Sequence, residues 1–425
     1  MRRRIAHAPR SDPDHAMMTK LGVLIGLTLL AGLPLLAQDW PQFLGPGRDG
    51  RYTGPPITAE WGEDGPTEVW RRSVGAGFAG PVVADGLVIV FHRVDGREVV
   101  EAVDPASGRT VWRHEYASTY RDDFGFDEGP RSAPVVVDGR VFTFGAQGRL
   151  HALSVTTGEV LWEVDTKADF QFRKGFFGAA GSPVVEGGHV IANIGGRDAG
   201  VVAFDADNGS VVWTALDDDA SYSSGVGATF GGVRHAVFLT RSYVVGLDPT
   251  DGTVRFSLPW RSRSMSSVNA ATPLVVDDLI FVSASYGTGA GLFRVNGDRL
   301  EEVWASDDVM SNHYATSVHD EGYLYGFHGR QEYSPSFRAV DLRTGEVKWD
   351  VASFGGGTVT LAGDRLVIVR ETGELLIADA SPQAFTPIAR ARILSSVVRA
   401  YPALSNGRLY VRDEDTLICL DLRAR

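Results

Sequence analysis

Cysteine occurs only once among the 425 residues, at Cys419. One cysteine cannot close a disulfide within the chain, even in a compartment that would permit one. Cys419 stands in the stretch DTLICLDL, which has the pattern of a strand. We therefore predict that this thiol is a small buried apolar group and not a reactive one.

Basic side chains are outnumbered, with 41 lysine and arginine residues against 53 aspartate and glutamate residues and a formal net charge of −12. Loss of residues 1–37, which hold five basic and two acidic side chains, would change the net charge to −15. A surface this acidic repels nucleic acid and anionic lipid. Both are therefore excluded as partners.

Long apolar runs are almost absent, and the one present, LGVLIGLTLLAGLPLLA, occupies residues 21–37 after Lys20. This run is short for a membrane span and ends in a small residue, as secretory signal peptides do. We predict a signal peptide over residues 1–37, with Met17 or Met18 as an alternative start and Gln38 near the mature N-terminus. No cysteine ends the run, so no lipid attachment is expected there. The mature chain is expected to be periplasmic or secreted and to have no transmembrane segment.

Helical spacing of apolar residues is missing from every long stretch. Short β-branched runs alternate instead with Asp-Gly, Asn-Gly or Thr-Gly, as in successive β-hairpins. The fourth run of each repeat carries a large aromatic residue after the pattern Asp-x-x-(T/S/D/N)-Gly-x-x-x. Residues at this place are Trp112, Trp162, Trp213, Phe256, Trp304 and Trp349, which are 43 to 51 residues apart. This period is typical of a four-stranded propeller blade.

Eight copies of the repeat are present. Their first strands are expected to start at Pro81, Pro134, Pro183, Gly225, Pro273, Ser317, Val359 and Pro402. The last copy has room for only three strands, while PTEVWRRSVG at residues 66–75 matches a fourth. The sequence therefore predicts an all-β fold, an eight-bladed β-propeller of four-stranded antiparallel blades over residues 67–425. Its last blade is closed by the N-terminal strand, after a leader segment of residues 38–66.

Small residues stand two places before all eight of those starts. They are Ala79, Ser132, Gly181, Ser223, Ala271, Ala315, Gly357 and Ala400. Inner strands of a propeller converge on its axis, where larger side chains would not fit. This pattern supports the same fold independently of the tryptophan period.

The repeat Asp-x-x-Thr-Gly-x-x-x-Trp resembles that of the PQQ-type, or quinoprotein dehydrogenase-like, β-propeller family from Glu68 to Arg425. The leader DWPQFLGPGRDG is similar to that of exported bacterial members. The WD40 class fits less well, because Trp349-Asp350 is the only Trp-Asp pair and no Gly-His opener accompanies it. The family includes quinoprotein alcohol dehydrogenases and BamB, a non-catalytic outer-membrane assembly scaffold. The resemblance implies a BamB-like binding or scaffold protein of the cell envelope, which we expect to be a monomer.

The same resemblance implies an alternative, a PQQ-dependent quinoprotein dehydrogenase. The large quinoprotein alcohol dehydrogenases carry an adjacent cysteine pair and a Glu-Asn-Asp calcium set, and neither is found in this sequence by motif. PQQ with calcium stays open as a cofactor, because its three carboxylates would suit Arg131, Arg330 and Arg399. HExxH and GxSxG motifs are absent, and no catalytic residue is predicted.

The longer connections should gather on one face, because the chain reverses direction at each strand. They are residues 117–129, 168–177, 217–222, 260–269, 285–291 and 329–336. The opposite face carries only short turns. Loops on a rigid scaffold commonly carry function, so we expect the binding site on the face with the long connections.

Several polar and aromatic residues stand beside the inner strands on that face. The candidate ligand-binding residues are Arg131, Tyr222, Asn269, His313, Tyr314, His328, Arg330 and Arg399. We expect them at one mouth of the channel, with His328 and Arg330 on the rim. Crowded cations need an anion or acidic neighbours, so the predicted partner is a small anionic ligand or a protein. The alternative is that these side chains only bridge loops and blades.

An acidic stretch, RDDFGFDEG, brings four carboxylates close together in sequence. Asp122, Asp123, Asp127 and Glu128 could surround calcium, but a solvated or arginine-paired loop is favoured. The GxGxxG match at residues 75–80 leads into a strand and not into a helix, which excludes a dinucleotide loop.

Overall fold

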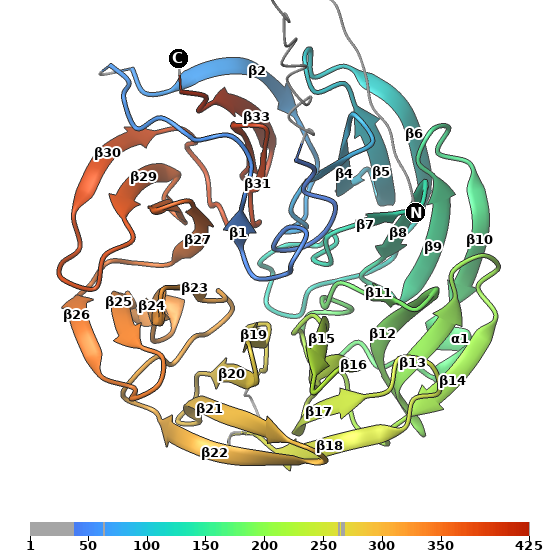
Figure 1. Ribbon diagram of the computed structural model, residues 1–425. Helices are drawn as coiled ribbons and strands as arrows, with labels where there is room; N and C mark the ends of the chain where they lie inside the picture. The colour runs from blue at the N-terminus through green and yellow to red at the C-terminus, as the bar shows by residue number, and fades with distance from the viewer. Residues whose placement is uncertain (1–37, 63, 262–263, 265–267, 425) are drawn as a thin grey trace, which may run out of the picture. The chain divides into compact units, whose positions relative to one another are not determined.

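The computed structural model describes residues 38–424 except 63, 262–263 and 265–267. The predicted signal peptide and part of the connection 260–269 therefore lie outside the described residues. Eight antiparallel sheets are arranged in a ring, each a blade of the predicted propeller (Figure 1). Among the described residues, none of the helices has the length and hydropathy needed to cross a membrane.

The strands of the first four blades follow one another along the chain. They are β3 (Val82–Ala84), β4 (Leu87–Val94), β5 (Arg97–Val103) and β6 (Thr110–Ala117); β7 (Val135–Val137), β8 (Arg140–Phe144), β9 (Arg149–Ser154) and β10 (Val160–Asp165); β11 (Val184–Glu186), β12 (His189–Gly196), β13 (Ala199–Asp205) and β14 (Val211–Ala215); β15 (Val226–Phe230), β16 (Val233–Leu239), β17 (Tyr243–Leu247) and β18 (Val254–Pro259). A short helix, α1 (Thr166–Phe170), follows blade two.

The remaining blades keep the same order. They are β19 (Leu274–Val276), β20 (Leu279–Ala284), β21 (Gly289–Asn296) and β22 (Arg299–Ser306); β23 (Val318–Asp320), β24 (Tyr323–His328), β25 (Ser336–Asp341) and β26 (Val347–Val351); β27 (Gly357–Ala362), β28 (Arg365–Arg370), β29 (Glu374–Asp379) and β30 (Pro387–Arg392); β31 (Ala403–Ser405), β32 (Arg408–Arg412) and β33 (Thr416–Asp421). First strands begin one residue after the predicted start in seven blades and two residues before it in blade seven.

The N-terminal strand β2 (Thr67–Ser73) completes blade eight. It pairs antiparallel with β33, from Thr67 opposite Asp421 to Ser73 opposite Thr416. The predicted closure of the last blade by the N-terminal strand is thus confirmed. Cys419 of β33 is fully buried at this junction, as its strand pattern predicts.

The tryptophan and glycine of the repeat meet across neighbouring blades. Trp112 of blade one donates its indole N–H to the carbonyl of Val155 in blade two at 2.7 Å. Its ring lies over Gly158, where a Cβ atom would come within 2.4 Å of it. The same pairing joins Trp70 to Gly108, Trp162 to Gly209, Trp213 to Gly252 and Trp304 to Gly345. The motif is therefore the contact between one blade and the next.

Two positions of the repeat depart from this pairing. Trp349 donates to the Ser381 carbonyl at 2.8 Å, and none of the described glycines has the Trp349 ring near its Cβ position. Phe256 replaces tryptophan in blade four, and Gly297 in the following blade has no neighbour near the position of a Cβ atom. The aromatic N–H donor and the covered glycine are therefore missing together.

The middle strands of each blade are buried on both faces, because a blade packs between two neighbours. β4 and β5 are buried over almost their whole length, whereas the outer strand β6 alternates only partly. This is why the sequence shows continuous runs such as LVIVF in place of strict alternation.

Hydroxyl groups link the inner strands of blades three to six. In blades four to six the side chain one place before the predicted blade start accepts a hydrogen bond from the backbone N–H of the corresponding residue in the preceding blade. Ser182 donates to the Ser224 hydroxyl at 2.9 Å, and Thr272 donates to Thr316 at 2.9 Å. Thr316 in turn donates to the hydroxyl of Tyr401 in blade eight at 2.5 Å. These bonds satisfy backbone donors that face the channel.

The small residues two places before the blade starts pack against the next blade. A Cβ atom on Gly181 would lie 2.4 Å from the carbonyl oxygen of Ser223 in the neighbouring inner strand. Two causes therefore keep these residues small: the inner strands converge on the axis, and each inner strand also contacts the next one closely.

The leader segment runs along the inside of the ring. Trp40 forms a bridge with Val83 of blade one, and β1 (Arg51–Tyr52) pairs parallel with the inner strand β27 of blade seven. Between them, Leu44 and Arg48 are buried. Tyr52 accepts a bond from Gly407 in a short turn of blade eight, so the leader enters from the face with the short turns. Its residues fill the channel from that side.

Candidate ligand-binding pocket

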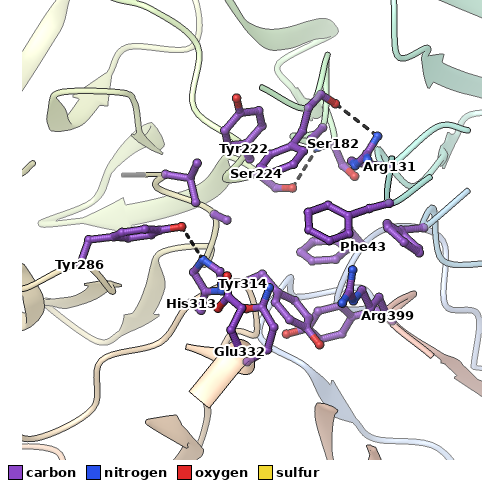
Figure 2. Close-up of a pocket in the computed structure, with 18 residues that line it drawn as sticks. Phe43, Arg131, Ser182, Tyr222, Ser224, Tyr286, His313, Tyr314, Glu332 and Arg399 are labelled. Carbon is purple, nitrogen blue, oxygen red and sulfur yellow. Dashed lines mark hydrogen bonds between the residues drawn. The ribbon is translucent and has the colours of Figure 1, made fainter. Parts of the chain in front are cut away.

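A cavity of about 200 Å³ lies at the channel mouth on the face with the long connections (Figure 2). One register position, three residues before each predicted blade start, contributes seven of the 18 lining residues, and we call it the mouth row. The mouth-row residues in the wall are Phe78, Arg131, Ala180, Tyr222, Ala270, Tyr314 and Arg399. The propeller repeat thus brings residues from seven blades to one place.

The structure places five of the eight candidate residues in this wall. Arg131, Tyr222, His313, Tyr314 and Arg399 all line the cavity. Figure 2 shows Arg131 and Arg399 on the same side as Phe43, opposite Tyr286 and His313.

Asn269 lies next to the wall but does not line it, because the mouth-row position of blade five is Ala270. The side chain of Asn269 is buried and donates to the carbonyl of Thr240 at 2.8 Å, with longer bonds to Arg241 and Trp260. Adjacent residues of an extended chain point in opposite directions. Asn269 therefore ties the connections of blades four and five together.

His328 and Arg330 also lie outside the wall. His328, at the end of β24, accepts a hydrogen bond from the Ser311 backbone at 3.0 Å. Arg330 pairs with Glu332 at 2.8 Å and lies over the Tyr286 ring at 4.4 Å from its centroid. Glu332 and Tyr286 do line the cavity, so Arg330 supports the wall from behind.

The two terminal nitrogens of Arg131 are occupied by groups of two loops. Its Nη2 atom pairs with Asp122 at 3.0 Å, and its Nη1 atom donates to Tyr120 at 3.2 Å and to the Phe177 carbonyl at 3.4 Å. Its guanidinium also lies over the rings of Phe78 and Phe177. These contacts make Arg131 a brace between the connections 117–129 and 168–177.

Arg399 differs from Arg131 in how its donors are used. Its Nε atom bonds Glu371 at 3.0 Å, and the Tyr314 hydroxyl donates to the same carboxylate oxygen at 2.8 Å. Within the part of the chain that the structure describes, its Nη1 and Nη2 atoms have no hydrogen-bond partner. The guanidinium lies over Phe78 and Phe126, at 5.5 and 5.4 Å from the ring centroids.

His313 is held on both ring nitrogens. Its Nε2 atom bonds the Tyr286 hydroxyl at 2.9 Å, and its Nδ1 atom contacts the Gln331 amide oxygen on η1 (Gln331–Tyr333). Burial lowers the pKa of His313 to about 4, and the positive charges of Arg330 and Arg399 contribute, while Glu332 opposes the shift. His313 is therefore neutral near pH 7.

The acidic stretch does not gather its carboxylates at one point. Asp122 accepts from the backbone of Phe124 and Phe126 at 3.0 Å each and pairs with Arg131, while Asp123 contacts Lys174. Asp127 accepts from Gly77 and Gly129, and Glu128 pairs with Arg93 and Arg121. Among the described residues, no three His, Cys, Asp or Glu side chains are placed to hold a metal ion.

The other aromatic residues of the wall were not among the predicted site residues. Phe78 belongs to the mouth row, so the repeat register could have identified it. Phe126 and Phe177 come from long connections, and Tyr401 stands one place before its blade start. Phe43 comes from the leader, and no periodic signal places that segment inside the ring.

The part of the wall that the structure describes does not fit PQQ with calcium. Glu332 is the only carboxylate among the lining residues, and it already pairs with Arg330. The single cysteine is buried in blade eight. Of the three arginines expected to take the cofactor's carboxylates, Arg131 and Arg330 are engaged by the protein's own groups.

Comparison with protein families matches the chain to the family described as outer membrane protein assembly factor BamB, over residues 96–333 and 334–423. A BamB of Shewanella oneidensis is 22% identical over 382 residues, which cover 82% of this chain and 86% of that protein. The crystal structure of BamB from Moraxella catarrhalis superposes with a TM-score of 0.61 and 16% identity, covering 84% of this chain and 98% of that one.

Quinoprotein enzymes also share the fold. The quinohemoprotein alcohol dehydrogenase ADH-IIG of Pseudomonas putida is 31% identical over 140 residues. That match covers 32% of this chain and only 19% of the dehydrogenase. It therefore concerns a few blades of a much longer protein.

Proposed function

This chain belongs to the family described as outer membrane protein assembly factor BamB, and we propose that it is a non-catalytic binding or scaffold protein of the cell envelope. It acts in the periplasm after export, and its binding site is the face that carries the long connections. We expect its partner to be a protein involved in outer membrane assembly, as the names of its relatives indicate.

The distribution of exposed aromatic side chains supports this proposal. Phe124 is 56% exposed and Phe126 is 49% exposed, and both lie on the connection 117–129 beside the pocket. Tyr333 is 76% exposed at the rim formed by η1. Large aromatic groups left in water on loops mark interaction surfaces, because their burial by a partner is favourable.

The state of the polar groups in the wall supports a binding role over a catalytic one. His313 is neutral and bonded on both ring nitrogens, and Arg131 has both terminal nitrogens engaged. A general base or a nucleophile needs a free group within reach of the substrate. The described part of the wall offers shape, aromatic surface and hydrogen-bond donors.

Site-specific photo-crosslinking tests the proposal. A benzophenone side chain in place of Tyr333 should give a discrete crosslinked protein in cells that export this chain. Leu161, 49% exposed on β10 next to a short turn, is the matched control on the opposite face and should give none. The same substitution at Phe124 gives a second position on the long-connection face. Equal crosslinking yields from Tyr333 and Leu161, or no crosslinks from either Tyr333 or Phe124, would contradict the proposal.

A further inference from the structure

The charged side chains of the pocket wall are balanced in pairs. Arg131 pairs with Asp122 and Arg399 pairs with Glu371, each at 3.0 Å. Glu332 pairs with Arg330 at 2.8 Å. These three pairs carry no net charge, so they do not by themselves favour an anion or a cation.

A further cation lies directly beneath the wall. Arg48 of the leader is 3% exposed, and its Nη1 atom donates to the carbonyls of Gly225 at 2.9 Å and Ser182 at 3.4 Å. Its Nη2 atom contacts the Pro183 carbonyl. Among the described residues no carboxylate forms an ion pair with Arg48. Ser182 itself lines the cavity, so a positive charge without a direct ion-pair partner among the described residues lies one residue away from it. The carboxylate that interacts with this charge, Glu186, already pairs with Arg234.

This buried charge favours a single negative charge in the cavity. Burial lowers the pKa of Arg48 to about 9, so the side chain is still charged near pH 7. Interactions of buried charges are weakly screened by solvent. The free Nη1 and Nη2 atoms of Arg399 then provide a bidentate donor for the anionic group.

The rest of the wall is suited to a small ring. Eight aromatic side chains line a cavity of about 200 Å³, and a buried apolar cavity of about 150 Å³ holds benzene. Aromatic walls also recognise ammonium groups. Here, however, the guanidinium groups of Arg131 and Arg399 already lie over Phe78, Phe126 and Phe177. These arginines would repel a cationic ligand, and the ring faces that it would need are already covered.

We propose that the pocket binds a small aromatic monocarboxylate, with its carboxylate on the Nη atoms of Arg399 and its ring between Phe43 and the aromatic residues of the mouth row. Arg399 lies on the side of the cavity opposite Tyr286 and His313, so a carboxylate on Arg399 directs the ring of the ligand towards the middle of the cavity (Figure 2). This inference depends on the proposed function only in placing a binding site on the face with the long connections.

Three probes of similar size separate the effect of the charge from the effect of the ring. 3-Phenylpropanoate, 3-phenylpropanamide and 3-phenylpropylammonium are titrated into the mature chain by calorimetry at one ionic strength. The carboxylate should bind about 10- to 100-fold more tightly than the amide, the range for one charge-assisted hydrogen bond. The ammonium should bind most weakly. Equal affinities, or tightest binding of the ammonium, would overturn the proposal.

Arg399→Gln should remove the preference for the carboxylate and leave the affinity for the amide within about twofold. The amide thus reports that the variant pocket is still folded. Arg338→Gln is the control, because Arg338 forms a similarly buried pair with Asp350 at 2.7 Å and lies outside the wall. It should change neither affinity. Phe43→Ala should weaken the carboxylate and the amide by the same factor.

The outcomes distinguish the two proposals. If no probe binds but crosslinking from Tyr333 persists, the ligand class is wrong and the proposed function stands. If the carboxylate binds with the expected preference and crosslinking fails, the pocket is a small-molecule site and the scaffold role is wrong. If Arg399→Gln lowers the affinities for carboxylate and amide equally, Arg399 only supports the wall and the assigned orientation is wrong.

Discussion

At the scale of single residues, register decides what a side chain does. Arg131 and Arg399 share the mouth row, but loop carbonyls and carboxylates take up both terminal nitrogens of Arg131 and leave those of Arg399 available. Asn269 stands one place outside the row and serves only the loops. Residue type therefore predicts a candidate, and the neighbouring donors and acceptors decide its role.

Trp112→Phe should lower the free energy of unfolding by ~1–3 kcal/mol, because the buried Val155 carbonyl loses its donor. Urea denaturation measures the loss. Trp61→Phe is the matched control, since its indole donates at 3.4 Å in an exposed setting, and should cost less than ~0.5 kcal/mol. Equal losses would mean that the indole hydrogen bond between blades contributes little.

His151 should make stability depend on pH. Its ring is buried between blades one and two, 4.4 Å from the Tyr116 ring. Burial lowers its pKa to about 3, with further contributions from His114 and Arg149, whereas the unfolded chain titrates near 6.5. Between pH 6.5 and 3, His151 is therefore protonated in the unfolded chain but still neutral in the folded protein. The free energy of unfolding should therefore fall as the pH is lowered from 6.5 towards 3, by at most ~1.4 kcal/mol per pH unit.

The test compares His151 with an apolar ring. His151→Phe should flatten the dependence of the melting temperature on pH between 6.5 and 4. Two carboxylates face this region: Glu163 lies 3.3 Å from the imidazole, and Glu98 bonds Tyr116. Burial raises the pKa of Glu98, which opposes the histidine effect, but it titrates in both proteins and largely cancels in the difference. Parallel pH profiles would contradict the prediction.

At the scale of elements, the leader acts as part of the propeller. The leader strand β1 adds a fifth strand to the sheet of blade seven, and Arg48 of the leader bonds carbonyls of blades three and four. Short irregular segments of this kind are stabilised by contacts with distant parts of the chain, since they have few of their own. The pocket floor therefore depends on a segment outside the repeat.

Arg48→Gln should cost roughly 3 kcal/mol or more of unfolding free energy, because three buried carbonyls lose a charged donor. Limited proteolysis should also cut the leader earlier than in the original chain. Arg51→Gln is the control three residues away, where the side chain is 37% exposed, and should cost less than ~1 kcal/mol. Equal costs would show that the buried position of Arg48 is unimportant.

At the scale of the whole molecule, ring closure joins the two ends of the repeat. β2 supplies Trp70, which lies over Gly108 of blade one and donates to the Pro105 carbonyl at 3.0 Å. The contact between blades eight and one is thus of the same kind as the Trp-Gly contacts between the other blades. Closure leaves no blade without a neighbour on either face.

Gly108→Ala should destabilise the ring by ~1–3 kcal/mol more than Gly139→Ala, as measured by urea denaturation. Both glycines have positive φ, +71° and +73°, so the backbone strain is matched. Only at Gly108 would a Cβ atom meet a ring, at 2.8 Å from Trp70, whereas Gly139 is open. Equal effects would indicate that the contact at the closure adds nothing to stability.

The eight-bladed architecture and the position of the closing strand could both be predicted from the repeat. The Trp-Gly period and the small inner residues report contacts between identical neighbours, and such contacts repeat wherever the unit repeats. The same register placed Arg131, Tyr222, Tyr314 and Arg399 at one mouth. The same argument could have identified Phe78. Asn269 does not line the wall, because it stands one residue before the mouth-row position of blade five.

Only the tertiary structure decided which of these groups is available. The pairing of Arg131 with Asp122, the shared carboxylate of Arg399 and Tyr314, and the burial of Arg48 join residues far apart in the chain. These contacts arise in loops and in the leader, which follow no period. Their partners are set by the distances between atoms in the closed ring, and no local pattern of residues encodes those distances.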